Sequence, residues 1–299
     1  MHEVEKISFV ILHYMALEET KECVESIINN IAYENYNIVI VDNNSPNGSG
    51  VNIQGYFVKN DKVKVILNKK NSGFAKGNNI GYVYAKEKLK SDFIILINND
   101  TIIEQIDFID VFLEFYKKES YYALGPDIVT FLDKEKHQNP VRINGIDRNE
   151  LKRIIRNINI KYKIVKFIYK REYKKLFDIY LYFIEKLSKL RSNGKLDGNN
   201  VVRENVQLHG ACIILSPLYI KSSSYAFYPE TYMYMEEDIF YYLCKKNNFK
   251  IMYNPNLRIY HKEDVSTNMI VKSNIEKMLF ILKHSKYSSK VLLDLMKEN

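Results

Sequence analysis

The sequence predicts an α/β protein built on a doubly wound, mostly parallel sheet. Over about the first 125 residues, short apolar runs typical of buried strands alternate with segments whose apolar residues recur at helical spacing. Polar clusters directly follow several of these runs, and a parallel sheet binds its ligands at the carboxyl ends of its strands. A third observation sets the middle of the chain apart, because its excess positive charge falls between residues 148 and 195.

The first two strands and the helix between them start this sheet. Ile7–Leu12 is an apolar, β-branched run with the length of a strand buried on both faces. The next segment has apolar residues at i, i+3, i+4 and i+7 from Val24, which is one face of a helix. Ile38–Val41 is the second strand, and turn-forming residues follow it at 42–48.

The alternation continues along the chain. Val63–Leu67 is the third strand, Phe74–Lys90 the helix after it, and Phe93–Ile97 the fourth strand. Asp107–Lys118 again has a helical pattern, and Tyr122–Gly125 is a short apolar segment that ends the repeated β/α units. We therefore expect helices on both faces of the sheet.

Composition indicates a folded cytoplasmic protein. Of its 299 residues 46% are hydrophobic and 27% charged, which lies within the range of globular proteins. Its apolar runs are far shorter than the roughly 18–20 residues that cross a bilayer, and its charged first residues do not resemble a secretory signal. The three cysteines lack CxxC spacing, so we expect neither a disulfide framework nor a zinc site.

The positive charge is unevenly placed. The net charge of the chain is +8, but residues 148–195 hold fifteen Lys or Arg and four acids, a net charge of +11 that leaves −3 for the remainder. Between Leu176 and Leu187, apolar residues recur at helical spacing among lysines, which predicts basic amphipathic helices. Two interpretations stay open: a surface that lies on an anionic bilayer, and a solvated helical hairpin that covers the sheet.

Polar residues follow the second and third strands. Asp42 is placed either to accept a hydrogen bond from a nucleobase or ribose, or to cap the strand end in an Asx turn. Residues 71–79 lie between the third strand and its helix, where backbone amides at a helix N-terminus suit an anionic group. An ordinary strand-to-helix turn explains this segment equally well.

Oxygen-bearing side chains follow the fourth strand. Asn98, Asn99 and Asp100 come directly after a wholly apolar run. Such ligands suit Mg²⁺ or Mn²⁺, and one carboxylate together with a diphosphate completes a site of this kind. Alternatively, Asp100 and Thr101 cap the following helix.

Three adjacent acids, Glu236, Glu237 and Asp238, crowd the first turn of a predicted amphipathic helix. Complementarity to the helix dipole accounts for one or two of them. Because three carboxylates repel one another, their pKa values rise toward the range of a general base, and we expect at least one to act in catalysis. His261 stands between a strand-like segment and a polar loop, and a lone histidine is more often packed than a metal ligand.

Six motifs in order resemble the family 2 glycosyltransferases, and among them the rhamnosyltransferase-like branch that builds bacterial surface polysaccharides. The resemblance covers about residues 5–130 and 205–267. It implies a GT-A fold, with a Rossmann-like sheet and helices around it, and a metal-dependent transfer with inversion from a nucleotide-diphosphate sugar. The motifs are Asp42-Asn-Asn-Ser, Asn71-x-Gly-Phe-Ala-x-Gly-Asn-Asn, Leu96-Ile-Asn-Asn-Asp100, His209-Gly-Ala-Cys, Glu237-Asp238 and His261-x4-Ser.

The resemblance also divides the chain. It implies that residues 1–130 form the nucleotide-sugar half and residues 205–267 the acceptor and catalytic half. Between them lies the basic helical insert, 131–204, and a C-terminal helical segment, 268–299, follows.

Catalytic roles follow from the same resemblance. Asp238 corresponds to the catalytic base with Glu237 beside it, and Gly210 and Glu236 stand at the acceptor. Phe240 replaces a second Asp found in many relatives, which leaves the choice between Asp238 and Glu237 as base open.

The resemblance places the divalent cation, Mg²⁺ or Mn²⁺, at Asp100 and His261. Asn98 replaces the first acid of the common DxD motif, which weakens the expected metal affinity. The residues expected to bind the donor are His13, Asp42, Asn44, Asn71, Gly73, Lys76, Asn78, Asn98 and Asn99.

The predicted function is transfer of a sugar from a UDP- or dTDP-sugar to a hydroxyl of a growing, lipid-linked surface polysaccharide such as capsule or O-antigen. One alternative is a nucleotidyltransferase that makes sugar nucleotides, but residues 13–17 offer no glycine-rich basic phosphate loop. A non-enzymatic nucleic-acid-binding protein would use the basic stretch and leave the ordered acidic motifs unexplained, so we expect no nucleic-acid partner.

Overall fold

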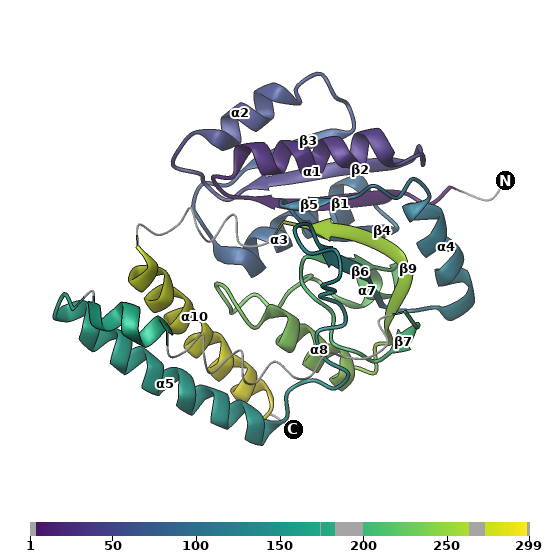
Figure 1. Ribbon diagram of the computed structural model, residues 1–299. Coiled ribbons are helices and arrows are strands. Elements are labelled where there is room, and N and C mark those ends of the chain that lie inside the picture. Colours follow the sequence, from purple (N-terminus) through teal and green to yellow (C-terminus); the bar gives the residue numbers. More distant parts are fainter. Residues whose placement is uncertain (1–3, 174, 183–199, 263–272, 298–299) are drawn as a thin grey trace.

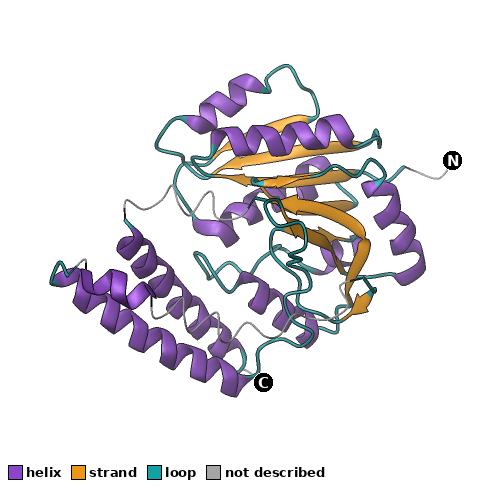
Figure 2. Cartoon of the chain, in the orientation of Figure 1, coloured by secondary structure: helices purple, strands orange, loops and turns teal. Residues whose placement is uncertain are grey.

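The computed structural model describes residues 4–173, 175–182, 200–262 and 273–297. Helices lie on both sides of one curled sheet (Figure 1, Figure 2). The strands are β1 (Ile7–His13), β2 (Tyr36–Asp42), β3 (Val63–Leu67), β4 (Phe93–Asn98), β5 (Thr101–Ile102), β6 (Ala123–Thr130), β7 (Arg203–Glu204), β8 (Cys212–Leu215) and β9 (Ile251–His261). The helices are α1 (Leu17–Asn30), α2 (Ser49–Tyr56), α3 (Gly73–Val83), the π-helix η1 (Tyr84–Leu89), α4 (Phe108–Glu119), α5 (Arg148–Lys170), α7 (Pro217–Ser222), α8 (Glu236–Lys246) and α10 (Asn274–Leu295).

The first half of the sheet is parallel, as the sequence predicts. The strand order is β3-β2-β1-β4-β8-β6-β9-β5, and β7 pairs with β9. β1 pairs in parallel with β2 and β4, and β2 with β3, in a register that sets His13 opposite Asp42 and Leu12 opposite Asn98. The polar residues that follow β2 and β4 therefore lie at the same edge of the sheet.

The second half of the sheet is mixed. β8 runs antiparallel to both β4 and β6, while β9 is parallel to β6. The short strand β5, directly after Asp100, pairs with the end of β9 and sets Thr101 opposite His261. The two residues expected to share a metal come together through this pairing, although 160 positions of sequence separate them.

Two apolar cores cover the two faces of the sheet. On one face, α1, α2 and α4 pack against the strands through residues such as Ile27, Ile53 and Phe112. On the other face, α3, α7 and α8 pack through residues such as Tyr82 and Phe240. The continuous apolar strands of the sequence follow from this arrangement, because both of their faces are buried.

Residues 131–147 differ from the expected helical insert. They form a loop that folds back along β6, with bridges between Val129 and His137 and between Arg142 and Gln207. The helix begins only at Arg148, where the side chain of Asp147 accepts the backbone N–H groups of residues 149 and 150. This loop therefore belongs to the sheet domain, and only the residues after it form the basic helix.

The basic helix packs on the C-terminal helix and not on the sheet. Val165 and Ile168 of α5 share an apolar cluster with Leu282 of α10, and Leu151 shares a second one with Ile239 of α8. α5 and α10 lie side by side, away from the strands (Figure 1). The described part of the expected hairpin therefore covers α8 and α10 and not the sheet, and residues 183–195 of it lie outside the described ranges. No helix in the described ranges has the length and apolarity to span a membrane.

Candidate active site

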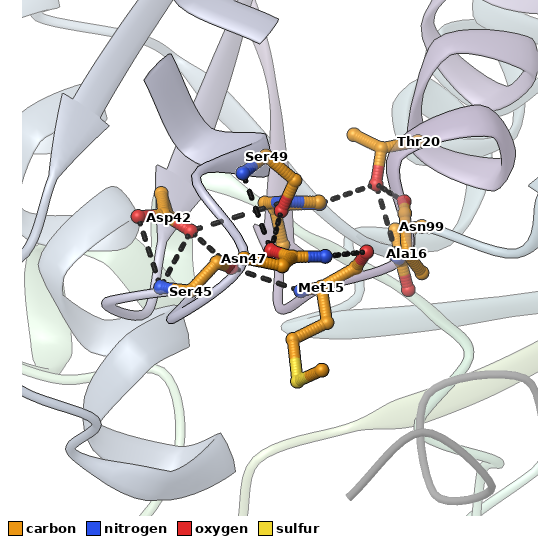
Figure 3. A network of polar contacts seen from close by, with 9 residues as sticks. Met15, Ala16, Thr20, Asp42, Ser45, Asn47, Ser49 and Asn99 are labelled. Atoms are coloured by element: carbon orange, nitrogen blue, oxygen red, sulfur yellow. Dashed lines mark hydrogen bonds and ion pairs between the residues drawn. The ribbon is translucent and has the colours of Figure 1, made fainter. Parts of the chain in front are cut away.

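Asp42 lies at the carboxyl end of β2 in a tight polar turn. Its Oδ1 accepts a hydrogen bond of 2.6 Å from the Ser45 hydroxyl, and both carboxylate oxygens lie within 3.3 Å of the Ser45 backbone nitrogen (Figure 3). Asp42 therefore fixes the turn after β2, although through the residue three positions on, whereas an Asx turn uses the residue two positions on. The turn fixes the direction of a carboxylate that is 6% exposed at the ligand edge of the sheet.

His13 lies beneath the site. Its Nδ1 is 2.7 Å from the Thr20 hydroxyl and its Nε2 is 2.8 Å from the Ser49 hydroxyl, and the ring is fully buried. Burial lowers the pKa of His13 to about 4, against the opposing effect of Asp42. With both ring nitrogens occupied, His13 has no atom free for the donor, which corrects the expected direct contact to a positioning role.

The same network reaches the end of β4. The Thr20 hydroxyl accepts a hydrogen bond of 3.0 Å from the Asn99 side chain (Figure 3). Asn99 and His13 therefore share one partner. Asn99 is buried. A continuous set of contacts therefore joins the turn at Asp42 to the turn that carries Asp100.

Asn43 links the Asp42 turn to the loop after β3. Its side-chain nitrogen donates to Asn71 Oδ1 at 3.0 Å and to the Gly73 carbonyl at 3.2 Å. Its Oδ1 accepts from the Ser72 backbone nitrogen at 2.9 Å. Asn44, which the sequence analysis chose, is exposed and has a left-handed backbone with φ 62°. Asn43 therefore holds the loop at residues 71–73, and Asn44, the residue expected to bind the donor, points to solvent.

Gly73 lies where two loops meet. Its φ is +81°, and a Cβ added there would lie 2.2 Å from the Tyr232 carbonyl oxygen. The backbone nitrogen of Phe74 donates to that same oxygen at 2.6 Å. In the helix that follows, Lys76 is exposed, whereas Asn78 is buried and donates to the Phe74 carbonyl.

We expect Gly73→Ala to weaken nucleoside diphosphate binding by roughly 5–150-fold, since the clash and the left-handed backbone together cost roughly 1–3 kcal/mol. Gly55→Ala is the matched control, because an added Cβ at Gly55 meets nothing within 4 Å. Calorimetric titration with UDP and dTDP measures both variants. Equal affinity of Gly73→Ala and Gly55→Ala would contradict the assignment of this loop.

Asp100 and His261 face each other. His261 Nε2 lies 3.2 Å from Asp100 Oδ1, and both side chains are less than 10% exposed. His261 Nδ1 is 2.8 Å from the carbonyl oxygen of the Gln138 side chain, and in the tautomer that donates to this oxygen Nε2 has a lone pair. Asp100 Oδ1 finds no hydrogen-bond partner among the described residues. Two lone-pair atoms therefore converge, an arrangement that a divalent cation stabilises.

These two side chains supply part of a coordination shell. Within the described ranges, no three His, Cys, Asp or Glu side chains gather to hold a metal. Mg²⁺ and Mn²⁺ commonly keep sites for water and phosphate oxygens and need few protein ligands. Asp100 and His261 thus fit a cation that is completed by a bound diphosphate, and they do not form a closed structural metal site.

The acids of α8 are held at the start of the helix by unusual backbone. Tyr234 and Met235, the two residues before it, both have left-handed conformations, with φ 71° and 68°. Asp238 Oδ1 accepts a hydrogen bond of 3.1 Å from Gln207. Burial raises the pKa of Asp238 to about 6, and the charge of Glu237 adds to the shift. Asp238 therefore has the pKa of an effective general base near neutral pH.

Glu236 and Glu237 occupy different surroundings. Glu236 is 5% exposed, and burial followed by the charge of Glu237 raises its pKa to about 8, so it is protonated at neutral pH. Glu236 is therefore a buried residue, whereas the resemblance implied that it stands at the acceptor. Glu237 Oε1 accepts a hydrogen bond of 3.2 Å from the Gly210 backbone nitrogen, and a Cβ at Gly210 would lie 2.9 Å from that oxygen.

His209 lies between the acids of α8 and the facing side chains of Asp100 and His261. Its ring centroid lies 5.7 Å from that of His261, and the next residue is Gly210, which contacts Glu237. The backbone nitrogen of His209 donates to Asn139 at 2.9 Å. The carboxylates of α8 and the Asp100 pair thus lie around one connected segment.

Sequence reasoning missed two residues of the 131–147 loop. Gln138 orients His261, and the buried Asn139 holds His209 in place. The sequence of this loop has no periodicity, and the sequence analysis assigned it to the basic helical insert together with the residues that follow. The one available signal was negative, because the helical pattern starts only after residue 147.

The pKa of Asp238 predicts where activity falls with acid. Because the base acts in its ionised form, kcat/KM should drop as the pH falls through about 6, and not near the ordinary value of 3.8. Glu237→Gln removes one cause of the raised pKa while keeping the side-chain oxygen that Gly210 contacts, so the acid limb should move to lower pH. If the acid limb of the kcat/KM profile lies at the same pH in Glu237→Gln as in the wild type, the charge of Glu237 does not raise the pKa of Asp238.

Comparison with known proteins decides the family. Residues 8–177, more than half of the chain, match the family model described as Glycosyl transferase family 2. The chain belongs to glycosyl transferase family 2. A curated relative, glycosyltransferase GlyG of Streptococcus pneumoniae serotype 4, is 26% identical over 121 residues, which are 40% of this family 2 chain and 38% of GlyG.

Solved structures share the fold of this family 2 chain. S. aureus TarS 1-349 aligns with a TM-score of 0.53 at 13% identity, over 95% of this chain and 72% of that one. GalNAc-T7, solved with UDP, GalNAc and Mn²⁺, aligns with a TM-score of 0.56 at 13% identity, over 87% of this chain and 44% of that one. The expected GT-A fold is confirmed, and family membership favours the glycosyltransferase over the two alternative function classes.

Proposed function

We propose that this protein transfers a sugar, with inversion, from a UDP- or dTDP-sugar to a hydroxyl of a lipid-linked surface polysaccharide. The observation that carries the proposal is the placement of Asp238, with its raised pKa, in one connected site with Asp100 and His261. A base on one side and a diphosphate-binding pair on the other are what a single displacement at an anomeric carbon needs.

The proposed reaction uses the residues as follows. Asp238 takes the proton of the acceptor hydroxyl, whose oxygen attacks the anomeric carbon from the face opposite the diphosphate. The bond between that carbon and the diphosphate oxygen breaks, and the nucleoside diphosphate leaves with the electron pair. Glu237 is the alternative base. One displacement without a covalent enzyme intermediate inverts the anomeric carbon.

The donor lies along the edge of the sheet in this proposal. Asp42 contacts the nucleoside, and the loop that Asn43 and Gly73 shape closes over it. Asp100 and His261 hold a divalent cation, Mg²⁺ or Mn²⁺, which neutralises charge on the diphosphate when bound. The UDP of the TarS and GalNAc-T7 structures and the Mn²⁺ of the latter support these choices.

The acceptor is the least constrained part of the proposal. The six motifs of the rhamnosyltransferase-like branch support a hexosyl or rhamnosyl transfer in capsule or O-antigen synthesis. A lipid-linked acceptor places the enzyme in the cytoplasm at the inner leaflet of the membrane, as a peripheral protein.

A donor panel tests the activity. The full chain is incubated with UDP-, dTDP- and GDP-sugars and Mn²⁺, and slow release of nucleoside diphosphate is measured in the absence of acceptor. We expect turnover of at least one UDP- or dTDP-sugar, and loss of that turnover on chelation of the cation. Release of pyrophosphate in place of nucleoside diphosphate would indicate a nucleotidyltransferase and reject the proposal.

A further inference from the structure

One side of α5 is an uncovered apolar stripe. Val165 and Ile168 face α10 and are buried there. Ile160, Ile164 and Phe167 are 52%, 41% and 54% exposed. Their spacing of four and three residues lines them up along one side of the helix. Helix α5 therefore has two apolar faces: one is buried against α10, and the stripe is exposed to solvent.

The stripe continues into the helical residues 175–182. Ile164 and Phe167 line a groove of about 510 Å³ together with Leu176, Ile179 and Tyr180. Its lining is almost wholly apolar. Leu176 and Ile179 are themselves exposed, so two helices share the surface. A contiguous exposed apolar surface of this kind marks an interaction site.

The charged residues that border the stripe on α5 are basic. Arg156 lies one helical turn before Ile160, and Lys163 lies between the apolar positions and lines the groove. The guanidinium carbon of Arg171 lies 5.7 Å from the centroid of the Phe167 ring. α5 as a whole holds eight basic residues and one acid, and that acid lies in its first turn. On the adjoining helix, Asp178 is the single acid among residues 175–182.

Apolar side chains bordered by basic ones indicate what binds this surface. Apolar side chains bordered by Lys and Arg match a bilayer interface with anionic headgroups, where the side chains enter the acyl boundary and the basic groups stay at the headgroups. A second copy of the chain would bring the same positive charge to the contact. Residues 183–199, outside the described ranges, hold four basic and two acidic residues and are also positively charged.

We infer that the exposed stripe of α5, with the groove it shares with residues 175–182, docks the protein on an anionic lipid bilayer. The inference deepens the proposed function and rests on it for the lipid-linked acceptor. Each Lys or Arg near an anionic surface adds to the electrostatic attraction, and the apolar stripe adds insertion into the acyl boundary. Binding therefore requires both anionic lipid and the apolar side chains.

Helix α10 connects the docking surface to the loop that precedes α8. α5 packs on α10, and the Ser288 hydroxyl of α10 donates to the Met233 carbonyl at 3.0 Å. On the same helix, the His284 ring stacks on Tyr232, with 4.7 Å between the centroids. Two residues, Tyr234 and Met235, separate residues 232–233 from the acids of α8. A bilayer bound at α5 thus has a fixed relation to the loop that meets the acceptor.

Vesicle flotation tests the inference. The full-length protein is mixed with phosphatidylcholine vesicles that contain or lack phosphatidylglycerol. We expect it to float with the anionic vesicles, to stay at the bottom with the neutral ones, and to be released by high salt. Nucleoside diphosphate release without vesicles is measured on the same samples, so that failure of docking and failure of the proposed activity are separate results.

Two sets of variants identify the surface. The triple variant I160S/I164S/F167S removes the stripe and keeps every charge, and its flotation should fall at least about tenfold. Its matched control, V51S/V58S/I106S, removes three exposed apolar side chains elsewhere and should float like the wild type.

The charge variant K163E/R171E should likewise lose flotation, whereas K88E/K118E, two exposed lysines outside this surface, should not. Circular dichroism melts establish that the variants are folded. Flotation of the triple variant equal to that of its control would overturn the inference. Absence of wild-type flotation, or salt-sensitive capture of single-stranded RNA in its place, would overturn it as well.

Discussion

Asp238→Asn should reduce kcat for sugar transfer by roughly 10²–10⁴-fold, the range that a positioned general base contributes. The amide keeps the size of the side chain and an oxygen that accepts from Gln207. Donor binding should therefore stay within about threefold of the wild type, because Asp238 is not proposed to touch the nucleotide. Steady-state kinetics and calorimetric titration with the nucleoside diphosphate measure the two quantities separately.

Glu237→Gln is the matched comparison for this prediction. Its side chain keeps the oxygen that contacts Gly210, so its loss of kcat should be at least about tenfold smaller than that of Asp238→Asn. The reverse order would assign the base to Glu237. Full activity of Asp238→Asn would reject Asp238 as the base outright.

Asp100→Asn and His261→Ala should each abolish the dependence of donor binding on a divalent cation. In the presence of Mn²⁺, the affinity for nucleoside diphosphate should fall by about 10–100-fold, because His261→Ala removes one of the two facing ligand atoms and Asp100→Asn removes the negative charge of the other. Without cation, the variants and the wild type should bind equally weakly. Calorimetric titrations with Mn²⁺ and with chelator provide all four comparisons.

The control for the cation prediction is Asp294→Asn, an exposed carboxylate at the end of α10. It changes the net charge as Asp100→Asn does and should leave the Mn²⁺ dependence intact. A wild type whose affinity is the same with Mn²⁺ and with chelator would contradict the assignment of Asp100 and His261.

The parts of the fold that the sequence predicted best are those whose pattern is set by burial on both faces. The predicted strands Ile7–Leu12 and Phe93–Ile97 end one residue before the observed ones, Ile7–His13 and Phe93–Asn98, because apolar runs between polar ends have few alternatives. The same reasoning placed Asp42 and Asp100 at the carboxyl ends of two strands, and in the structure Asp42 ends β2 and Asp100 lies two residues after β4.

What the sequence did not reveal depends on contacts between distant segments. The choice of Asn43 over Asn44 is made by hydrogen bonds to residues 71–73, and His13 is excluded from direct contact by Ser49 of a helix that the sequence analysis did not predict. Gln138 enters the site through a loop without periodicity. These partners are distant in the sequence, so its local hydrophobic and polar patterns do not predict them, and only the tertiary structure identifies them.

A crystal structure of the full chain with UDP or dTDP and Mn²⁺ tests the central claim most directly. The account predicts anomalous density for Mn²⁺ in contact with Asp100 and His261, the nucleoside beside Asp42, and the Asp238 carboxylate facing the far side of the diphosphate site. A nucleotide bound away from this edge of the sheet, or Mn²⁺ bound without either Asp100 or His261, would contradict it.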